Sequence, residues 1–562
     1  MTIKSGMNRR AFMGLSGAAL ASSALQSAAD GLEQPHSMHP TSDMGQLAKR
    51  PNIILFMPDE LRADSLACYG NPLTKTPNFD RLAADGTRFA NCHVQFPVCG
   101  ASRCSLLTGW PTSVRGHRSL QYFLRPEEPN LFRYLKQGGY DVFWYGKNDA
   151  LAAQTFYDSV TDWSESGKGG VGPRGYGSAY SAYGLTPGAY SFLYPSSGDP
   201  RTMYDYALVQ SAIDVLNRKE ADRPFCIFLP LEQPHPPYTA PEHFYDMYNP
   251  KDVPRLASTN LPNKPSYVAG IREAYGLDKV SEETFRRIRA VYYGKVSYTD
   301  WLLGELLEAV ERTNHDKDTA LFVLSDHGDY AGDYGLVEKW PSGLEDCLTH
   351  VPLIARVPGG VKGNQSVEMV ELFDVMQTCL DLAEVPANHT HFSRSLCPQI
   401  LGKPGDKNRS AFAEGGYNVY EPQCFETHGA PAADAPSRLG KLPQTDPGGG
   451  PYPGKGILQM ERPQTVSRSA MVRTADNKLI LRAQGQCELY SYANDPLEEK
   501  NLFGESGVAE LQDHLERKLL YWYMNTTGIA PYDKDQRAMP PTETTLPFPN
   551  NRWEDIIDSP DV

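Results

Sequence analysis

Polar side chains able to bind a metal ion or an oxyanion follow four short apolar runs in this sequence. The runs cover residues 52–57, 141–145, 225–231 and 320–325. The side chains that follow them are Asp59, Glu60, Lys147, His235, Asp326 and His327. Apolar runs of this length are typical of strands buried on both faces, as in a parallel sheet. Because ligands bind beyond the carboxyl ends of such strands, we expect these groups to meet at one edge of a sheet.

Cys99 lies in a second segment of unusual composition, Cys99-Gly100-Ala101-Ser102-Arg103-Cys104-Ser105-Leu106-Leu107-Thr108-Gly109. This segment resembles the sulfatase signature, Cys-x-Pro-x-Arg followed shortly by Leu-Thr-Gly, which marks the cysteine for oxidation to formylglycine. The resemblance continues in order along the chain, from about Pro51 to Leu502. Its further motifs are Asp59, Gly146-Lys147, Pro234-His235-Pro236, Ser325-Asp326-His327-Gly328, Lys339, Val472-Arg473-Thr474, Lys478-Leu479, Glu488-Leu489-Tyr490 and Asn494-Asp495-Pro496.

Each of these residues also has a purely structural interpretation. A carboxylate pair at a strand end can cap the next helix, and a lone cysteine is commonly a small buried residue. Single histidines are more often packed or exposed than bound to a ligand. These interpretations are independent of one another, whereas the motifs occur in one shared order. The order therefore favours the family interpretation.

The resemblance implies hydrolysis of sulfate esters. A sulfate ester is a poor electrophile, because its outer oxygens repel a nucleophile and its bridging oxygen must leave as an alkoxide or phenoxide. The site must therefore neutralise charge and protonate the leaving group. In the family, a hydrated aldehyde at the position of Cys99 presents two geminal hydroxyls. One attacks sulfur and the other later expels sulfate, a step that a thiol could not perform.

The same resemblance implies one bound divalent cation. Its expected ligands are Asp59, Glu60, Asp326, His327 and Cys99 in its formylglycine form. Carboxylate oxygens favour calcium. The imidazole of His327 is a softer donor than calcium prefers, so magnesium and manganese also stay open.

The remaining polar residues have roles in binding sulfate and moving protons. Arg103 is expected to hold the nucleophile in place. Lys147 and Lys339 are expected to bind sulfate oxygens. His235 is the candidate for contacting the bridging oxygen and assisting departure of the alcohol.

The sequence departs from the family pattern in three respects. Ala101 replaces the signature proline, a variant associated with the radical-type maturase of bacteria, so the formylglycine-generating maturase of this chain stays open. The metal positions carry Glu60 where aspartate is usual and His327 where asparagine is common. After Lys147 the family usually supplies a histidine, but here Asp149 is the nearby polar group. An anion beside sulfate is unfavourable unless it is protonated or paired, so Asp149 is retained only as a candidate proton carrier or substrate contact.

Amphipathic helical patterns alternate with the apolar runs that should carry the site. They cover residues 130–137, 204–219 and 283–311. Alternation of this kind predicts an α/β fold, with a large mainly parallel or mixed sheet sandwiched by helices. Strand-like stretches at 470–482 and 487–492, followed by a helical pattern at 508–523, predict a smaller C-terminal α+β subdomain with an antiparallel sheet.

The 562-residue chain divides into five predicted segments. They are a twin-arginine signal peptide at 1–30, a linker at 31–50, the catalytic domain at 51–410, a loop-rich insertion at 411–465 and the C-terminal subdomain with its tail at 466–562. The signal is indicated by Arg9-Arg10, an apolar run at 14–25 and the small residues Ser27-Ala28-Ala29. It implies the twin-arginine translocase as a partner and a periplasmic or secreted location.

Composition limits the other partners. The net charge of −14 argues against nucleic acid, whose binding needs a basic face. No run after the N-terminus reaches the roughly 18 apolar residues that a membrane span needs. The ten cysteines show neither a CxxC pair nor zinc-type spacing, so neither a disulfide scaffold nor a zinc site is indicated.

Three functions are compatible with this pattern. A sulfated carbohydrate is the expected substrate, because the chain carries an export signal and its long loops are rich in aromatic residues that can stack on sugar rings. A phosphonate or phosphate ester hydrolase on the same scaffold is the first alternative. An inactive binder of sulfated glycans is the second, motivated by Ala101 and Asp149.

Overall fold

The computed structural model describes most of the chain between residues 46 and 530. The described ranges are 46–165, 193–218, 223–418, 420–421, 424–425 and 458–530. The predicted signal peptide, most of the linker, much of the loop-rich insertion and the end of the tail lie outside these ranges.

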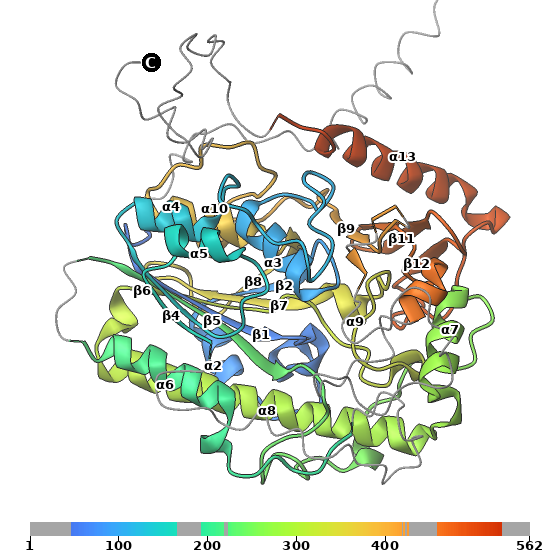
Figure 1. The fold of residues 1–562 in the computed structure, drawn as a ribbon, viewed down its shortest axis with the longest axis horizontal. Coiled ribbons are helices and arrows are strands. Elements are labelled where there is room, and N and C mark those ends of the chain that lie inside the picture. The colour runs from blue at the N-terminus through green and yellow to red at the C-terminus, as the bar shows by residue number, and fades with distance from the viewer. Residues whose placement is uncertain are drawn as a thin grey trace, which may run out of the picture.

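An eight-stranded mixed sheet forms the centre of the larger unit (Figure 1). Its strands, in spatial order, are β4 (Asp162–Ser164), β3 (Asp141–Tyr145), β5 (Phe225–Pro234), β1 (Asn52–Asp59), β6 (Thr319–Leu324), β7 (His350–Arg356), β2 (Thr87–His93) and β8 (Asn364–Glu371). The five strands from β4 to β6 run parallel. β7 is antiparallel to both of its neighbours, and β2 pairs parallel with β8. The predicted α/β class with a mainly parallel, mixed sheet is confirmed.

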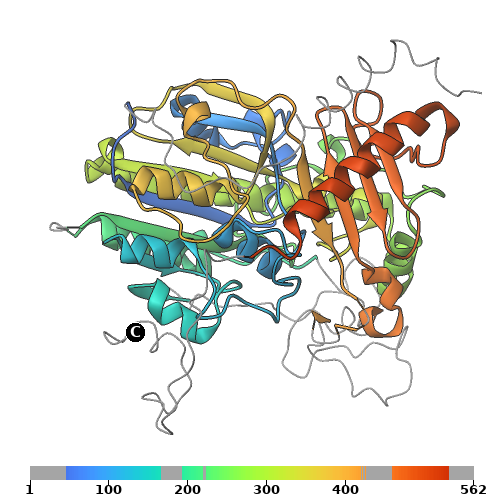
Figure 2. The same ribbon diagram turned by 90° about the horizontal axis from the view of Figure 1, so that it is seen from above.

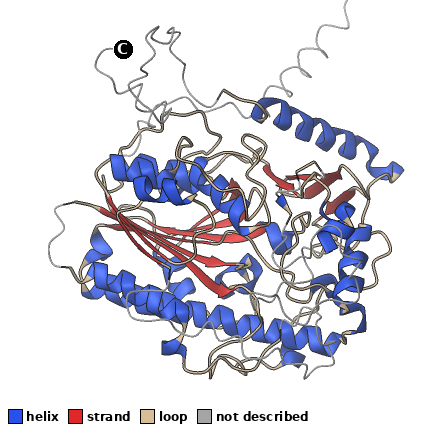
Figure 3. Ribbon diagram, in the orientation of Figure 1, coloured by secondary structure: helices blue, strands red, loops and turns tan. Residues whose placement is uncertain are grey.

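Helices cover both faces of this sheet, as Figures 1 and 3 show. One face packs against α3 (Cys99–Thr108), α4 (Leu131–Gln137), α5 (Ala153–Ser159) and α10 (Asp374–Ala383), and the other against α2 (Pro77–Asp85), α6 (Tyr204–Leu216) and α8 (Glu282–Arg312). Side chains of a strand alternate between its two faces. In β1, Ile54 and Phe56 accordingly join one hydrophobic cluster, while Ile53 and Leu55 join the other. After Asn52 this strand carries only apolar side chains until Asp59, and the site begins there.

The three predicted helices are confirmed as α4, α6 and α8. α4 is capped by Asn130, whose side chain accepts a hydrogen bond from the Arg133 amide at 2.9 Å. α8 is capped in the same way by Ser281, which accepts from the Thr284 amide. Further helices are α7 (Ser266–Tyr275), α9 (Asp346–Thr349) and α11 (Cys397–Ile400). Among the described helices, none combines the length and the apolar character that crossing a bilayer requires.

A second sheet, of four antiparallel strands, forms the smaller C-terminal unit beside the first (Figure 2). Its order is β12 (Glu488–Ser491), β11 (Asn477–Arg482), β10 (Ser469–Arg473) and β9 (Ala411–Gly415), and α13 (Ala509–Thr526) packs across it. The predicted antiparallel sheet with a helix is therefore present. The predicted loop-rich insertion from 411 to 465 differs from the structure at its start, because residues 411–415 pair with β10 along their whole length. Only this pairing with a strand more than fifty residues later makes the segment a strand.

Gly146 joins β3 to Lys147 in a conformation that other residues rarely adopt, with φ at 135°. A Cβ atom at this position would lie 2.2 Å from the Pro230 carbonyl oxygen on β5. That carbonyl accepts the Lys147 amide at 3.1 Å, so the close approach of the backbones also places Lys147.

We expect Gly146→Ala to lower the free energy of unfolding by at least about 2 kcal/mol, from backbone strain and overlap with β5. Denaturant unfolding measures this change. Gly507→Ala is the matched control, since a Cβ at Gly507 meets no atom within 4 Å, and it should change stability by less than about 0.5 kcal/mol. Equal stability of the two variants would contradict this account of Gly146.

Candidate active site

Four strand ends and the start of α3 converge on one buried group of polar side chains. β1 ends at Asp59, His235 directly follows β5, and Lys147 lies two residues after the end of β3. Asp326 and His327 come shortly after β6, and Cys99 is the first residue of α3. Parallel neighbours end at the same sheet edge, so β1, β5 and β6 bring residues far apart in sequence together.

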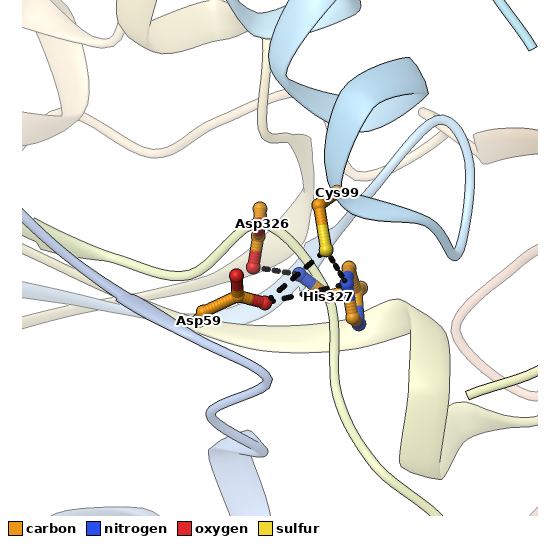
Figure 4. A group of neighbouring side chains, drawn as sticks. All are labelled: Asp59, Cys99, Asp326 and His327. Carbon is orange, nitrogen blue, oxygen red and sulfur yellow. Dashed lines mark hydrogen bonds and ion pairs between the residues drawn. The ribbon is translucent and has the colours of Figure 1, made fainter. Parts of the chain in front are cut away.

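Asp59, Cys99, Asp326 and His327 form the centre of this group (Figure 4). One ligand atom from each lies within 4.8 Å of the others, and all four residues are buried. The Cys99 Sγ atom is 3.4 Å from Asp59 Oδ1 and 3.1 Å from His327 Nε2. Two carboxylates, an imidazole and a fourth side chain converging on one point suit a divalent cation.

The tautomer of His327 also fits a ligand role. Its Nδ1 lies 2.9 Å from the Gly328 carbonyl oxygen, which can only accept a hydrogen bond. Nδ1 therefore carries the hydrogen, and Nε2 directs a lone pair toward Cys99 and Asp59. A backbone carbonyl that fixes the free nitrogen of a ligand histidine is the usual arrangement at metal sites.

Two cations balance the two buried carboxylates. Arg103 donates from Nε to Asp326 Oδ2 at 2.8 Å and from a terminal nitrogen to Asp59 Oδ2 at 3.0 Å. The Lys147 ammonium contacts Asp59 Oδ2 at 2.9 Å and lies 3.7 Å from the Cys99 Sγ atom. Burial alone would raise the pKa of Asp59, but Lys147 and Arg103 hold it well below its ordinary value. The contacts of Arg103 are thus with the carboxylates, and Asp59 directs its other oxygen, Oδ1, toward Cys99.

Arg103 reaches these carboxylates because it follows Cys99 by one helical turn. Residues four positions apart lie on the same face of a helix. α3 ends at Gly109, which adopts the left-handed conformation and donates its amide to the Ser105 carbonyl. The Cys-x-x-x-Arg spacing of the signature therefore follows from helix geometry.

Glu60, His235 and Lys339 form a second cluster next to the first. Lys339 makes an ion pair with Glu60 Oε1, and its Nζ lies 2.8 Å from His235 Nε2. His235 Nδ1 donates to the Pro236 carbonyl at 2.6 Å, so Nε2 is the acceptor for Lys339. Burial lowers the pKa of His235 well below its ordinary value, and the Lys339 ammonium lowers it further. Glu60, which the sequence predicts as a cation ligand, lies against Lys339 and His235, and Asp59, Glu60 and His235 form a second group able to hold a metal ion.

Asp149 forms an ion pair with Lys147, its Oδ2 lying 2.9 Å from the ammonium. An anion near the sulfate position was expected to need a partner, and Lys147 is that partner. Lys147 therefore contacts two carboxylates, Asp59 and Asp149, in addition to its approach to Cys99.

Two residues of α8, Tyr292 and Lys295, hold backbone carbonyls beside the site, although their functional role was not predicted from the sequence. Lys295 is fully buried and donates to the carbonyls of His235 and Pro237, the latter at 2.7 Å. Burial lowers the pKa of Lys295 to about 8. Tyr292 donates to the Glu60 carbonyl at 2.6 Å. In the sequence both belong to an ordinary amphipathic helix, and the only available signal was a lysine among its apolar positions.

Comparison with known proteins identifies the family. The sequence model of the sulfatase family matches residues 51–385. An arylsulfatase of Clostridium perfringens is 27% identical over 379 residues, which span 60% of this chain and 75% of that protein. An N-acetylglucosamine-6-O-sulfatase of Bacteroides thetaiotaomicron is 23% identical, with 84% of this chain and 86% of that protein covered.

The fold is shared with solved structures as well. A phosphonate monoester hydrolase of Agrobacterium radiobacter superposes with a TM-score of 0.65 at 22% identity, covering 85% of this chain and 96% of that one. The family match spans the segments that supply every residue of the buried group described above. The chain therefore belongs to the sulfatase family and is a sulfuric ester hydrolase.

Proposed function

We propose that this sulfatase cleaves sulfate esters of carbohydrates through a formylglycine derived from Cys99. The observation that carries the proposal is the placement of the Cys99 side chain against Asp59 Oδ1 and His327 Nε2, within the four-residue group. A nucleophile at this point lies beside Asp59, His327 and Lys147.

The surroundings of Cys99 make the unmodified thiol a poor nucleophile. Burial raises the pKa of the Cys99 thiol, and the nearby Asp59 carboxylate raises it further. The unmodified side chain is therefore a protonated, weakly nucleophilic thiol at neutral pH. A hydrated formylglycine supplies one hydroxyl for attack on sulfur and a second whose deprotonation restores the aldehyde and expels sulfate.

One divalent cation is proposed at Asp59, Glu60, Asp326, His327 and the modified Cys99, with calcium expected and magnesium or manganese as alternatives. Such a cation favours ionisation of the geminal diol and screens the charge of the sulfate group. Arg103 contacts Oδ2 of both Asp59 and Asp326, and Lys147 contacts Oδ2 of Asp59. These contacts leave Asp59 Oδ1 directed toward the nucleophile.

Lys147 and Lys339 are proposed to bind the sulfate oxygens, and His235 to contact the bridging oxygen. His235 is neutral in the resting site, because burial and Lys339 hold its pKa low. Arrival of an anionic sulfate beside Nε2 raises that pKa, since an opposite charge favours the protonated ring. The protonated imidazole can then donate to the departing alcohol.

A carbohydrate substrate is supported by the N-acetylglucosamine-6-O-sulfatase relative, which aligns with 84% of this chain. The paired arginines and apolar run at the N-terminus support export through the twin-arginine translocase to the periplasm or beyond. Conversion of Cys99 then requires a formylglycine-generating maturase before export, and Ala101 favours the radical type.

Phosphonate or phosphate ester hydrolysis is the second candidate. It is favoured by the shared fold with a phosphonate monoester hydrolase. A catalytically inactive glycan binder is the third, and it requires Cys99 to remain a thiol.

The first prediction concerns the mass of the peptide that contains Cys99. In protein from a host with a maturase, its residue mass should be lower than that of cysteine by about 18 Da, because CH₂SH becomes CHO. Peptide mass spectrometry measures this. A Cys99→Ser variant made where serine is not oxidised should lose activity by at least about 10³-fold. An unmodified thiol in fully active protein would refute the mechanism.

The second prediction concerns the fraction of protein in which Cys99 is still a cysteine. Under native conditions at neutral pH, iodoacetamide should label the half-buried Cys487 at least about ten times faster than Cys99, because the reactive species is the thiolate. Mass spectrometry of both peptides gives the two rates, and denaturation should make them equal. Rapid labelling of Cys99 in the folded protein would show that the thiol is already activated.

The third prediction separates the candidate reactions. Matched sulfate, phosphate and phosphonate esters of the same alcohol are compared by kcat/KM with the matured enzyme. The sulfate ester should be preferred to the doubly charged phosphate monoester by at least about 10-fold, because the three cations near Cys99 are already paired with carboxylates and suit a single negative charge. A preference for the phosphonate ester would favour the second candidate.

A further inference from the structure

Lys295 lies within α8, where every residue from 288 to 300 is buried. Its side chain reaches the backbone of His235. We propose that Lys295 is a positioning residue, which fixes the segment around His235 so that the imidazole is aimed at the bridging oxygen of the ester. The inference rests on the proposed function, because His235 has its role in that function.

The Lys295 ammonium binds the backbone on both sides of Pro236. It donates to the His235 carbonyl and, at 2.7 Å, to the Pro237 carbonyl. The carbonyl of Pro236 itself accepts His235 Nδ1 at 2.6 Å. These three carbonyls belong to consecutive residues, so a group that fixes the outer two also fixes the one that orients the ring. Nε2 is thereby directed toward Lys339, 2.8 Å away, where the sulfate group is proposed to bind.

The segment around His235 has few hydrogen-bond donors of its own. It reads Pro234-His235-Pro236-Pro237, and proline has no backbone N–H. The His235 amide is therefore the one backbone donor in these four residues, and it donates to the Glu232 carbonyl at 2.9 Å. Donors that hold the carbonyls of this segment must come from elsewhere in the fold, and Lys295 supplies two such hydrogen bonds.

The helix α8 can approach this part of the chain closely because Gly294 precedes Lys295. A Cβ atom at Gly294 would lie 2.2 Å from the Phe244 carbonyl oxygen, so a larger residue would push the two backbones apart. The chain that follows His235 therefore packs directly against the helix.

Burial of Lys295 is costly, and its contacts offset that cost. The residue is completely buried, and its two hydrogen bonds go to carbonyl oxygens. Burial lowers the pKa of Lys295 to about 8, although the carboxylates of Glu232 and Asp329 favour its charged form. Hydrogen bonds from a charged donor are stronger than those between neutral groups. An apolar side chain at this position would avoid the cost of burial but would leave the His235 segment without these bonds.

Leaving-group dependence separates this role from a general loss of stability. Matured, full-length Lys295→Met is compared with the original chain on a sugar sulfate and on para-nitrophenyl sulfate. The value of kcat/KM should fall by at least about 10-fold on the sugar sulfate but by less than about 3-fold on the nitrophenyl ester, because only the poorer leaving group needs the proton that His235 donates. Equal losses on the two esters, or no loss on either, would overturn the proposal.

Lys264→Met is the matched control. Lys264 is also a buried lysine, but its ammonium pairs with the carboxylates of Glu345 and of Glu488 on β12. The control therefore removes a buried charge that does not act on the His235 segment, and it should change kcat/KM on the two esters by the same factor. A selective loss on the sugar sulfate in this variant would overturn the assignment, because any destabilising change would then produce the same signature.

A double-mutant cycle tests the dependence on His235 with any ester that the enzyme turns over. Lys295→Met should lower kcat/KM by at least about 10-fold in the original chain but by less than about 3-fold in a His235→Gln background. Equal losses in the two backgrounds would overturn this inference alone. Inactivity of the original matured chain toward every ester would overturn the proposed function and this inference with it. If Lys295→Met does not fold, Lys295→Gln replaces it in both tests with the same criteria.

Discussion

The site depends on one constraint: carboxylates that are buried close together must each be paired with a cation. Asp59, Glu60 and Asp326 are completely buried at strand ends. Each would be costly there without a cation, and removal of one partner from such a pair typically costs about 3–5 kcal/mol. Arg103, Lys147 and Lys339 supply the partners from three different segments. The charges proposed to bind substrate are therefore also the charges that allow these segments to pack together.

The pairing pattern gives each carboxylate oxygen a separate task. Asp59 presents Oδ2 to Arg103 and Lys147 and Oδ1 to Cys99. Asp326 likewise gives Oδ2 to Arg103 and uses Oδ1 to accept the amides of Glu60 and His327. Such fixed carboxylates are preorganised, so they need little rearrangement when charge develops during the reaction. The long helix α8 contributes from outside the site by holding the chain after β1 and β5 through Tyr292 and Lys295.

Much of the fold and of the site could be predicted from the sequence, for identifiable reasons. The parallel strands carry continuous apolar runs, and the helices α4, α6 and α8 carry strong periodicity. The strands β2 and β8 alternate irregularly, and β7 pairs with strands distant in the chain, so these three strands were not predicted. β9 was assigned to a loop for the same reason. Lys295 gave only the weak signal of a lysine among apolar helix positions, because it acts on backbone carbonyls that only the folded chain brings near.

The sequence by itself determined the chemistry available to this protein: a Cys-x-x-x-Arg segment on a helix, carboxylates and histidines placed after apolar strands, and the order that identifies a sulfatase. The tertiary structure decided which of those groups touch. It placed Asp59, Cys99, Asp326 and His327 around one point and turned the Glu60 side chain to Lys339 and His235. The physical reason is that residue types and local spacing determine which helices and strands form and which class of reaction is available. The direction of a buried carboxylate is instead set by the charges that the whole fold brings within a few ångströms of it.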